Sequence, residues 1–430
     1  MVFLLVNSLI FFIYLTYTCH YFRPLSQMIY LLPNGIRLIY FEAKSEVSHL
    51  GVMVKTGSRD ELANENGLAH FIEHCIFKGT TNRKAVHILS RMDSIGGELN
   101  AYTTKEETVL YSSFLNEYLP RAVELLSDIL LNSIFPFKEI EKEKAVIRDE
   151  INMYKDNPSE DIFDCFDELV FPDHPLGRNI LGTVKSLKKF KAHHITEFIQ
   201  RNFSNENLVV SYVGNLPFNK VVKLVERNFE PANFLGNVNN RIIPTSSEPK
   251  QLLKKKRLNQ SHCVIGKSSF HLHHPLRLAF TVVNNILGGQ AMNSRLNLNI
   301  REKYGYCYAI DSSFHAYSDS GIFNLYFATD AKYFPKTRDL VLKEFKKMIE
   351  KPLTDKQVIQ AKTQLKGHLA LSQQNLQNRM LANAKSVLLF NEPNPLAKTL
   401  KDINNLSTRQ LNEASEQVFG DSNFMELIFE

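Results

Sequence analysis

Residues 65–80 read ENGLAHFIEHCIFKGT and contain the pattern H-x-x-E-H at His70, Glu73 and His74. Residues four apart in a helix lie one turn apart on the same face, so the imidazoles of His70 and His74 would project side by side. Two imidazole nitrogens in this arrangement suit a zinc ion, and Glu73 would lie within reach of a water molecule on that ion. So short a motif also arises by chance in an amphipathic helix, and alone it leaves both interpretations open.

A catalytic zinc ion usually has three protein ligands, so a third ligand is expected on another element. The segment 141–158, EKEKAVIRDEINMYKDNP, offers Glu143 and Glu150, which are seven residues and hence two helical turns apart. Ile147 lies between them on the same stripe, and an apolar residue there indicates a partly buried face rather than a solvated one. The other acids of this segment are interpreted as surface residues.

Taken together, these motifs resemble the pitrilysin family of zinc peptidases, which includes insulin-degrading enzyme and the mitochondrial processing peptidase. The family motif is H-x-x-E-H followed about 76 residues later by a glutamate, and here 150 − 74 = 76. The resemblance covers nearly everything after Met28. Besides the motif itself, it is carried by the segments 96–108, 141–151, 174–183 and 287–314.

The resemblance implies a role for each residue of the motif. His70, His74 and Glu150 would bind one Zn²⁺ per chain. Glu73 would be the general base, and Glu143 would be an acid that supports the ligands without binding the metal itself. The chain would then be a zinc metalloendopeptidase in which Glu73 assists the attack of a zinc-bound water on the scissile carbonyl.

The second half of the chain has no H-x-x-E-H pattern and is not expected to bind zinc. In the family, an arginine and a tyrosine seven residues later reach from this region to the active site of another half. The matching residues are Arg301 and Tyr308, and the tyrosine would help to stabilise the oxyanion. Tyr306 and Cys307 stand where many relatives have Leu-Ala. Placement of Arg301 and Tyr308 in a helix end and a core strand, without a catalytic role, stays an open alternative.

The substrate is expected to be a short or unfolded peptide held in an extended conformation. In the family, such a peptide is added to an edge strand by main-chain pairing. The segment 96–104, GGELNAYTT, would carry that strand, with Asn100 and Ala101 at the substrate-contacting positions. No pocket specific for one side chain is evident, so selection by length and lack of structure is expected.

The alternation of strand and helix patterns predicts an α+β fold made of two homologous domains. The resemblance implies that each domain is an α/β sandwich with a mostly antiparallel sheet and helices on one face. A chain of 430 residues exceeds what one core usually supports. The segment 195–214 also resembles 411–430, at an offset of 419 − 203 = 216 residues, about half the chain. Chance similarity over twenty residues is the alternative explanation.

The predicted domains are an apolar extension (1–27), a zinc-binding catalytic domain (28–229), a linker (230–257) and a homologous zinc-less domain (258–430). Pro, Gly, Asn and Ser residues followed by a basic run define the linker. The nearly apolar residues 2–17 have three interpretations, namely an artefact of an upstream start with translation beginning at Met28, an uncleaved anchor, or an export signal. Membrane contact is expected only if they are retained, and a cytoplasmic location is favoured.

Local patterns predict a hairpin at Asn34-Gly35 and several helices. The predicted helices cover 67–77, 84–94, 119–133, 138–155, 219–229, 276–287, 335–350 and 355–390.

Composition excludes several classes of protein. Apolar residues make up 44% and charged residues 22%, which are globular values. The net charge of +6 is spread over a long chain, so no nucleic-acid partner is expected. The five cysteines lie far apart without a C-x-x-C pattern, which indicates neither a disulfide framework nor a cysteine-rich zinc site.

Three other features could bind a metal but favour a structural interpretation. The run His271 to His274 lies at a strand-to-helix turn with no acid nearby, and His193-His194 precede a predicted helix. Cys75 is rotated by about 100° from His74, so packing is favoured over ligation.

The resemblance also implies that two chains close into a clamshell chamber. A homodimer is expected because one chain carries both the zinc motif and the Arg/Tyr pair, and pairing with a zinc-less homologous subunit is the alternative. A non-catalytic scaffold subunit of the same fold is a second class of function, although such subunits usually have a degraded motif. A zinc hydrolase acting on something other than peptides is a third.

Overall fold

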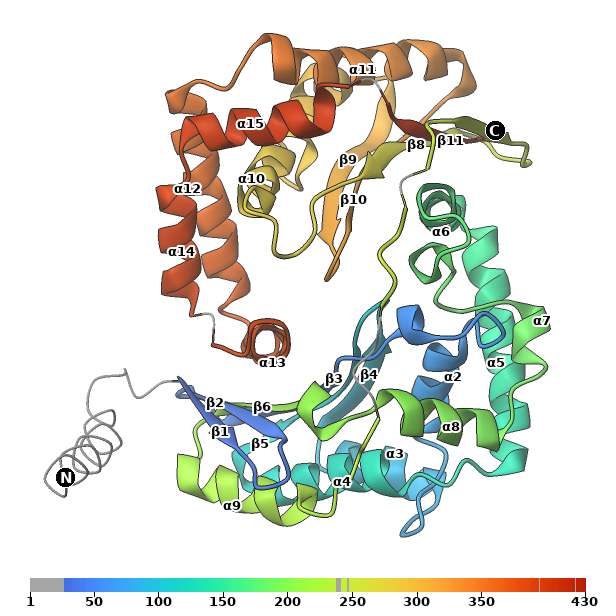
Figure 1. The fold of residues 1–430 in the computed structure, drawn as a ribbon, viewed down its shortest axis with the longest axis vertical. Helices are drawn as coiled ribbons and strands as arrows, with labels where there is room; N and C mark the ends of the chain where they lie inside the picture. The colour runs from blue at the N-terminus through green and yellow to red at the C-terminus, as the bar shows by residue number, and fades with distance from the viewer. Residues whose placement is uncertain (1–26, 237–240, 246, 394, 422) are drawn as a thin grey trace, which may run out of the picture.

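The computed structural model describes residues 27–236, 241–245, 247–393, 395–421 and 423–430. Two β-sheets, one from each half of the chain, organise these residues (Figure 1). The six-stranded first sheet has the order β1-β2-β6-β3-β5-β4, and the five-stranded second sheet has the order β7-β11-β8-β10-β9.

The first sheet is built from β1 (Gln27–Leu31), β2 (Arg37–Glu42), β3 (Val47–Val54), β4 (Glu98–Thr103), β5 (Thr108–Leu115) and β6 (Leu208–Gly214). The helices of this half are α2 (Leu68–Cys75), α3 (Ala85–Asp93), α4 (Leu119–Asn132), α5 (Phe137–Asp156), α6 (Pro158–Val170), α7 (Val184–Leu187), α8 (Ala192–Asn202) and α9 (Phe218–Phe229).

The second sheet is built from β7 (Gln251–Lys254), β8 (Ser261–Ser268), β9 (Cys307–Ala316), β10 (Gly321–Thr329) and β11 (Met425–Phe429). Its helices are α10 (Arg277–Gly288), a π-helical segment (Asn297–Glu302), α11 (Phe334–Glu350), α12 (Asp355–Ser372), α13 (Leu376–Phe390), α14 (Leu396–Asn405) and α15 (Thr408–Phe419).

The strands follow from their local sequences. The predicted Asn34-Gly35 turn joins β1 to β2 as an antiparallel hairpin, and Gly35 has a φ of +90°, which glycine adopts readily. The apolar run LVVSYVG becomes β6, which is buried along its whole length between β2 and β3. At the other side of the sheet, β4 pairs with β5 and has no strand on its second edge among the residues that the structure describes.

Most helices of each half cover one face of their own sheet. In the first half, Phe71 of α2 and Ile147 of α5 share a core with strand residues such as Leu110. In the second half, Phe280 of α10 packs edge to face on Phe323 of β10. These two cores supply the apolar burial that stabilises each half.

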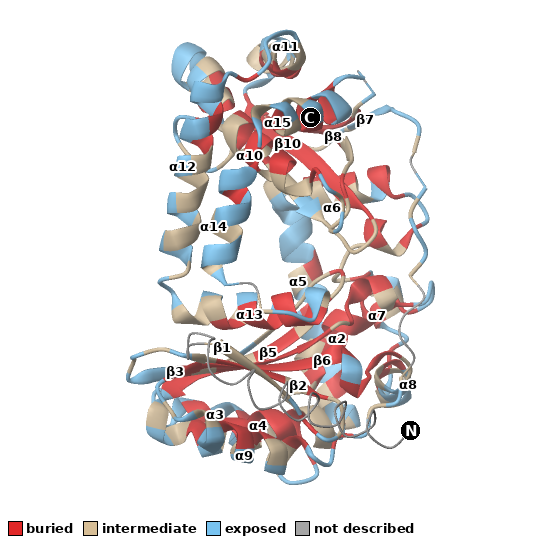
Figure 2. Cartoon of the chain, turned by 60° about the vertical axis from the view of Figure 1, so that its left-hand side comes forward, coloured by how far each residue is buried: buried red, intermediate tan, exposed pale blue. Residues whose placement is uncertain are grey.

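One helix from each half crosses to the other half's sheet. Phe166 of α6 shares an apolar cluster with Leu427 of β11, and Val387 of α13 shares one with Val209 of β6. Figure 1 shows α13 against the first sheet, and Figure 2 shows buried residues along it. The predicted α+β fold, with most helices of each half on one face of its own sheet, is confirmed, and this exchange covers the second face of each sheet.

A glycine makes the approach of α13 possible. A Cβ atom on Gly51 of β3 would lie 2.5 Å from Sδ of Met380. The Ser211 hydroxyl of β6 donates a hydrogen bond to the Met380 carbonyl oxygen at 2.8 Å. A side chain at position 51 would therefore require the end of the Met380 side chain to move.

The two copies of the faint sequence repeat occupy equivalent places. The segment 195–214 forms most of α8 and all of β6, and the segment 411–430 forms most of α15 and all of β11. Each last strand runs parallel to one neighbour (β2 or β7) and antiparallel to the other (β3 or β8).

Three local predictions differ from the structure. The predicted linker contains β7, because residues 251–254 pair in parallel with β11. The predicted helix 355–390 is broken into α12 and α13, since Asn375 caps the second helix by accepting a hydrogen bond from the Asn378 N–H. His193 and His194 lie inside the first turn of α8 rather than before it.

The apolar residues 2–17 lie outside the described residues. Within the described part of the chain, no helix is both long and apolar enough to cross a membrane. Four cysteines (Cys75, Cys165, Cys263 and Cys307) are described and all are free thiols.

Candidate metal and peptidase site

The zinc-motif helix α2 is held at its first turn. Gly67 caps it with a φ of +93°, and a Cβ atom there would lie 2.7 Å from the Gly182 Cα. The carboxylate of Glu61 accepts hydrogen bonds from the N–H groups of Gly67 (2.9 Å) and Ala69 (2.8 Å). Burial raises the pKa of Glu61 to about 8. These contacts fix the position of the first turn of α2, and therefore the position of His70, the residue that follows Ala69.

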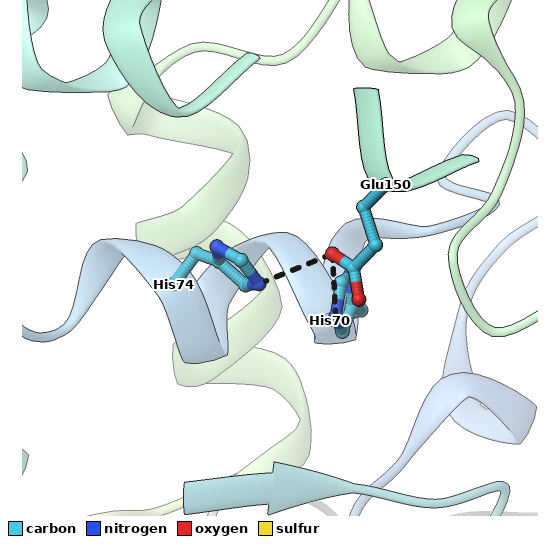
Figure 3. Close-up of side chains that lie close together, drawn as sticks. All are labelled: His70, His74 and Glu150. Carbon is cyan, nitrogen blue, oxygen red and sulfur yellow. Dashed lines mark ion pairs between the residues drawn. The ribbon is translucent and has the colours of Figure 1, made fainter. Parts of the chain in front are cut away.

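The three predicted ligands converge (Figure 3). Oε2 of Glu150 on α5 lies 3.8 Å from Nε2 of His70 and 3.6 Å from Nε2 of His74. One candidate ligand atom from each residue lies within 4.8 Å of the others, and this is the metal-capable group found among the described residues. Metal bonds of ~2.1 Å at tetrahedral angles would separate such atoms by about 3.4 Å. The observed separations fit that arrangement better than direct hydrogen bonds.

His70 is buried and suited to offer a lone pair. Burial, reinforced by the neighbouring His74, lowers the pKa of His70 to about 3. The imidazole is therefore neutral at pH 7, which is the form that binds a metal.

Glu143 holds the other nitrogen of His74. Its Oε2 lies 3.1 Å from Nδ1 of His74, and its Oε1 lies 2.7 Å from Nζ of Lys78. Burial alone would raise the pKa of Glu143, but the hydrogen bonds to His74 and Lys78 lower it. A charged carboxylate at Nδ1 directs the lone pair of Nε2 toward Glu150.

Glu73 lines a cleft beside the ligands. This cleft has a volume of about 270 Å³ and also contains His74, Asn100 and Ala101. Burial raises the pKa of Glu73, while Thr103 and His74 oppose the rise. A raised pKa makes a carboxylate a better proton acceptor than an ordinary glutamate.

The predicted substrate-contacting residues lie on the edge strand. Asn100 and Ala101 belong to β4 and pair with Tyr111 and Leu110 of β5. The opposite edge of β4 has no strand partner among the described residues. Its N–H and C=O groups are therefore available to another extended chain.

The structure does not bring Arg301 and Tyr308 to the ligands of the same chain. Every residue lining the Glu73 cleft belongs to the first half. Arg301 instead lies over the ring of Tyr308, with its guanidinium carbon 5.5 Å from the ring centre. The Tyr308 side chain is exposed, at 82% of its possible surface.

The other histidine and cysteine features have structural roles. Nδ1 of His271 accepts a hydrogen bond from the His273 N–H, and Nδ1 of His274 accepts one from the Leu276 N–H. His194 accepts one from Lys191 in the same way. Cys75 is buried, and burial raises the pKa of its thiol, so it favours the inert protonated form.

Two supporting residues were not predicted from the sequence. Lys78 lies four residues after His74 but beyond the end of α2 at Cys75, so helix periodicity did not indicate its contact with Glu143. Glu61 was not recognisable, because its role depends on a loop that folds back onto the start of α2.

Comparisons with known proteins show which family the chain resembles. The family models "Insulinase (Peptidase family M16)" and "Peptidase M16 inactive domain" match residues 38–184 and 189–365. The chain is 31% identical over 400 residues to an uncharacterized zinc protease, YmxG, of Bacillus subtilis, covering 93% of this chain and 97% of that protein. It is 34% identical over 400 residues to an uncharacterized zinc protease of Rickettsia felis, covering 90% and 94%.

Two solved structures share the fold. A peptidase M16 inactive domain from Pseudomonas fluorescens superposes with a TM-score of 0.86 at 18% identity, covering 94% of this chain and 98% of that chain. A protease from Helicobacter pylori gives a TM-score of 0.84 at 20% identity, covering 94% and 99%. The chain belongs to the peptidase M16 (insulinase) family, in its short two-domain form, which confirms the resemblance seen in the sequence.

Proposed function

We propose that this protein is a zinc-dependent endopeptidase that cleaves short or unfolded peptides. The observation that carries the proposal is that Oε2 of Glu150 lies 3.8 Å and 3.6 Å from the Nε2 atoms of His70 and His74. These atoms lie beside Glu73 and the unpaired edge of β4 among the described residues. Metal ligands, a proton acceptor and a peptide-binding edge are the parts that metal-assisted peptide hydrolysis requires.

The residues present fit a zinc ion. Two neutral imidazoles and one carboxylate are a common set of catalytic zinc ligands, and they leave a fourth position open. His70, His74 and Glu150 would hold the ion, and Glu143 would keep His74 in the required orientation. Zinc, when bound, supplies a Lewis acid that acidifies a water molecule and polarises a carbonyl group.

Glu73 performs the proton transfers. Its carboxylate accepts a proton from the attacking water and then donates it to the leaving amine of the substrate. Its place in the cleft beside His74 puts it next to the reacting atoms. The raised pKa supports the first step, because it makes the Glu73 carboxylate a better proton acceptor than an ordinary glutamate.

The substrate would pair with β4 as an added strand. Main-chain pairing fixes the peptide without reading its side chains, and it excludes folded segments that have no free edge of their own. Asn100 and Ala101 would contact the residues around the scissile bond, since both line the Glu73 cleft.

The exposed Arg301–Tyr308 pair would act in a dimer. Neither residue lines the cleft of its own chain, and the exposed Tyr308 ring is available to a second molecule. We therefore assign the pair to the active site of a partner chain, where Tyr308 would stabilise the oxyanion. A homodimer needs only this chain, and a zinc-less homologous subunit is the alternative partner.

Metal analysis combined with a peptide assay tests the proposal. The purified protein is expected to contain about one zinc per chain and to cleave quenched fluorescent peptides until a chelator removes the metal. Glu73→Gln should retain zinc and lose cleavage, whereas His70→Ala and Glu150→Ala should lose zinc. His193→Ala is a matched control, because that histidine is remote from the ligands in sequence and lies on α8.

Each part of the proposal has an outcome that contradicts it. Full activity of Glu73→Gln would remove Glu73 as the base. Unchanged zinc content in His70→Ala or Glu150→Ala would remove that residue as a ligand. Zinc binding without cleavage of any peptide would favour the scaffold or non-peptide alternatives.

A further inference from the structure

A second cavity lies between the two halves and begins where β4 ends. Its volume is about 720 Å³. The turn 103–107 and helix α6 line it from the first half, and β9, β10 and the start of α10 line it from the second half. Thr103 ends β4 and lines this cavity, while Asn100 and Ala101 line the Glu73 cleft. The free edge of β4 therefore leads from the zinc ligands into this inter-half cavity.

The spacing along β4 relates the inter-half cavity to the scissile bond. A strand rises by about 3.3 Å per residue, so Thr103 lies about 7–10 Å along the strand from Asn100 and Ala101. A peptide paired with this edge, with its scissile bond at Glu73, would place a residue two to four positions from that bond at the cavity.

Most charged groups on the cavity walls already have partners of opposite charge. An ion pair within a wall leaves little net charge for a ligand. The paired groups are Glu107 with Lys385 (2.7 Å), Asp167 with Lys105 (3.4 Å) and Glu106 with Arg59 (2.7 Å).

Arg277 is the exception among the cations. It is the first residue of α10, it lines the cavity, and its side chain has no hydrogen bond or ion pair with the described residues. Its guanidinium stays charged even though burial lowers its pKa. The remaining acid, Asp164, accepts a hydrogen bond from the Asn179 amide at 2.6 Å and has no ion pair.

We propose that Arg277 binds a carboxylate of the peptide substrate and thereby contributes to specificity. The proposal rests on the peptidase function proposed above. A guanidinium presents a planar fork of N–H donors that matches the two oxygens of a carboxylate. Thr281 and Asn324 add polar atoms to the same wall. The carboxylate can belong to an Asp or Glu side chain or to the peptide's C-terminus, two to four residues from the cleaved bond.

Paired peptides test the role of Arg277. Quenched fluorescent peptides of one sequence would carry Glu or Gln at a single position two to four residues from the cleaved bond, with a free or an amidated C-terminus. The kcat/KM of one carboxylate-bearing peptide should exceed that of its neutral twin by about ten- to a hundredfold, as for a hydrogen bond to a charged group. A response to Glu identifies the side chain as the source, and a response to amidation identifies the C-terminus.

Variants then connect this preference to one side chain. In Arg277→Gln, the ratio of kcat/KM between the carboxylate-bearing and the neutral peptide should fall close to one. Arg277→Lys keeps the charge but not the planar set of N–H donors, so it should give an intermediate ratio. The lysine variant also serves if the glutamine variant does not fold. Arg409→Gln, which removes an exposed arginine on α15, should keep the wild-type ratio. Equal cleavage of all twins by the wild type, or an unchanged ratio in Arg277→Gln, overturns the proposal.

A binding measurement separates this proposal from the peptidase function. Fluorescence anisotropy of the same peptides with zinc-loaded Glu73→Gln requires no cleavage. The peptide with the carboxylate should bind more tightly than its neutral counterpart, and this difference should disappear in the double variant Glu73→Gln, Arg277→Gln. That result supports carboxylate binding by Arg277 even if the wild type cleaves nothing. Equal binding of both twins counts against the site whatever the wild type cleaves.

Discussion

At the scale of single residues, the proposed zinc site would depend on side chains that contact its ligands without binding the metal. Glu143 is held by Lys78 and contacts Nδ1 of His74 at 3.1 Å. Glu143→Gln keeps the shape but removes the charge, so zinc affinity should fall by about 10–100-fold, as it does when such outer contacts are lost. Competition with a chromophoric chelator measures this. Glu141→Gln, a half-exposed acid of the same helix, is the control and should leave affinity unchanged. Equal affinities of wild type and Glu143→Gln would contradict the assignment.

The roles of individual residues were only partly predictable from the sequence. The side-by-side placement of His70 and His74 follows from helix periodicity, which is a local property. The convergence of Glu150 was expected only through the family resemblance, because 75 residues separate it from His74 and no local rule brings them together. The unpaired guanidinium of Arg277 had no sequence signal, since its lack of a partner among the described residues depends on what both halves place around the cavity.

At the scale of elements, the start of α2 depends on one glycine. A side chain on Gly67 would have to adopt a φ of +93° and would meet the Gly182 backbone at 2.7 Å. Gly67→Ala should lower the free energy of unfolding by roughly 2–4 kcal/mol, because left-handed strain and a backbone clash add. Urea denaturation measures this, and zinc content should fall with it.

Gly96→Ala is the matched control for that change. Gly96 has a φ of +69° but nothing within 4 Å of a Cβ atom, so only the strain of about 1–2 kcal/mol applies. Similar losses in the two variants would show that the contact with Gly182 does not position α2.

At the scale of the whole molecule, a buried cluster joins the two halves. Arg59, whose side chain is 1% exposed, contacts Glu106 at 2.7 Å in its own half and Asp319 at 2.6 Å in the hairpin between β9 and β10. It also donates a hydrogen bond to the carbonyl oxygen of Ile242 in the connecting segment. Ser318 of the same hairpin donates to Glu106. This cluster and the exchange of α6 and α13 hold the two sheets in one arrangement.

Loss of Arg59 should therefore be costly. Arg59→Met leaves Asp319 without its cation, and breaking a buried ion pair in this way destabilises a protein by about 3–5 kcal/mol. Urea denaturation should show that loss as a lower midpoint. Lys398→Met, which removes a pair with Glu392 that is half exposed, should change stability by no more than about 1 kcal/mol. If the two variants unfold alike, the cluster does not hold the halves together.

Mixed chains test whether the active site is completed by a partner. Glu73→Gln and Arg301→Ala should each be inactive alone. If Arg301 acts across a dimer, an equal mixture recovers about one quarter of wild-type activity, because half of the dimers are mixed and each has one intact site. Light scattering of the same samples reports the dimer. No recovery in a mixture that is shown to exchange subunits would place Arg301 outside the partner's site.

The sequence by itself determined the family, the α+β class, the two related halves and the residues of the zinc motif. These depend on helix and strand periodicity and on short motifs, all of which are local along the chain. Only the tertiary structure decided which sheet α6 and α13 cover, that Arg59 joins the halves, that Tyr308 is exposed and that Arg277 has no ion-pair partner in the described part of the chain. An apolar stripe or a single charge in the sequence indicates that a partner is needed, but it does not identify the partner. The partner is determined when surfaces distant in sequence pack together.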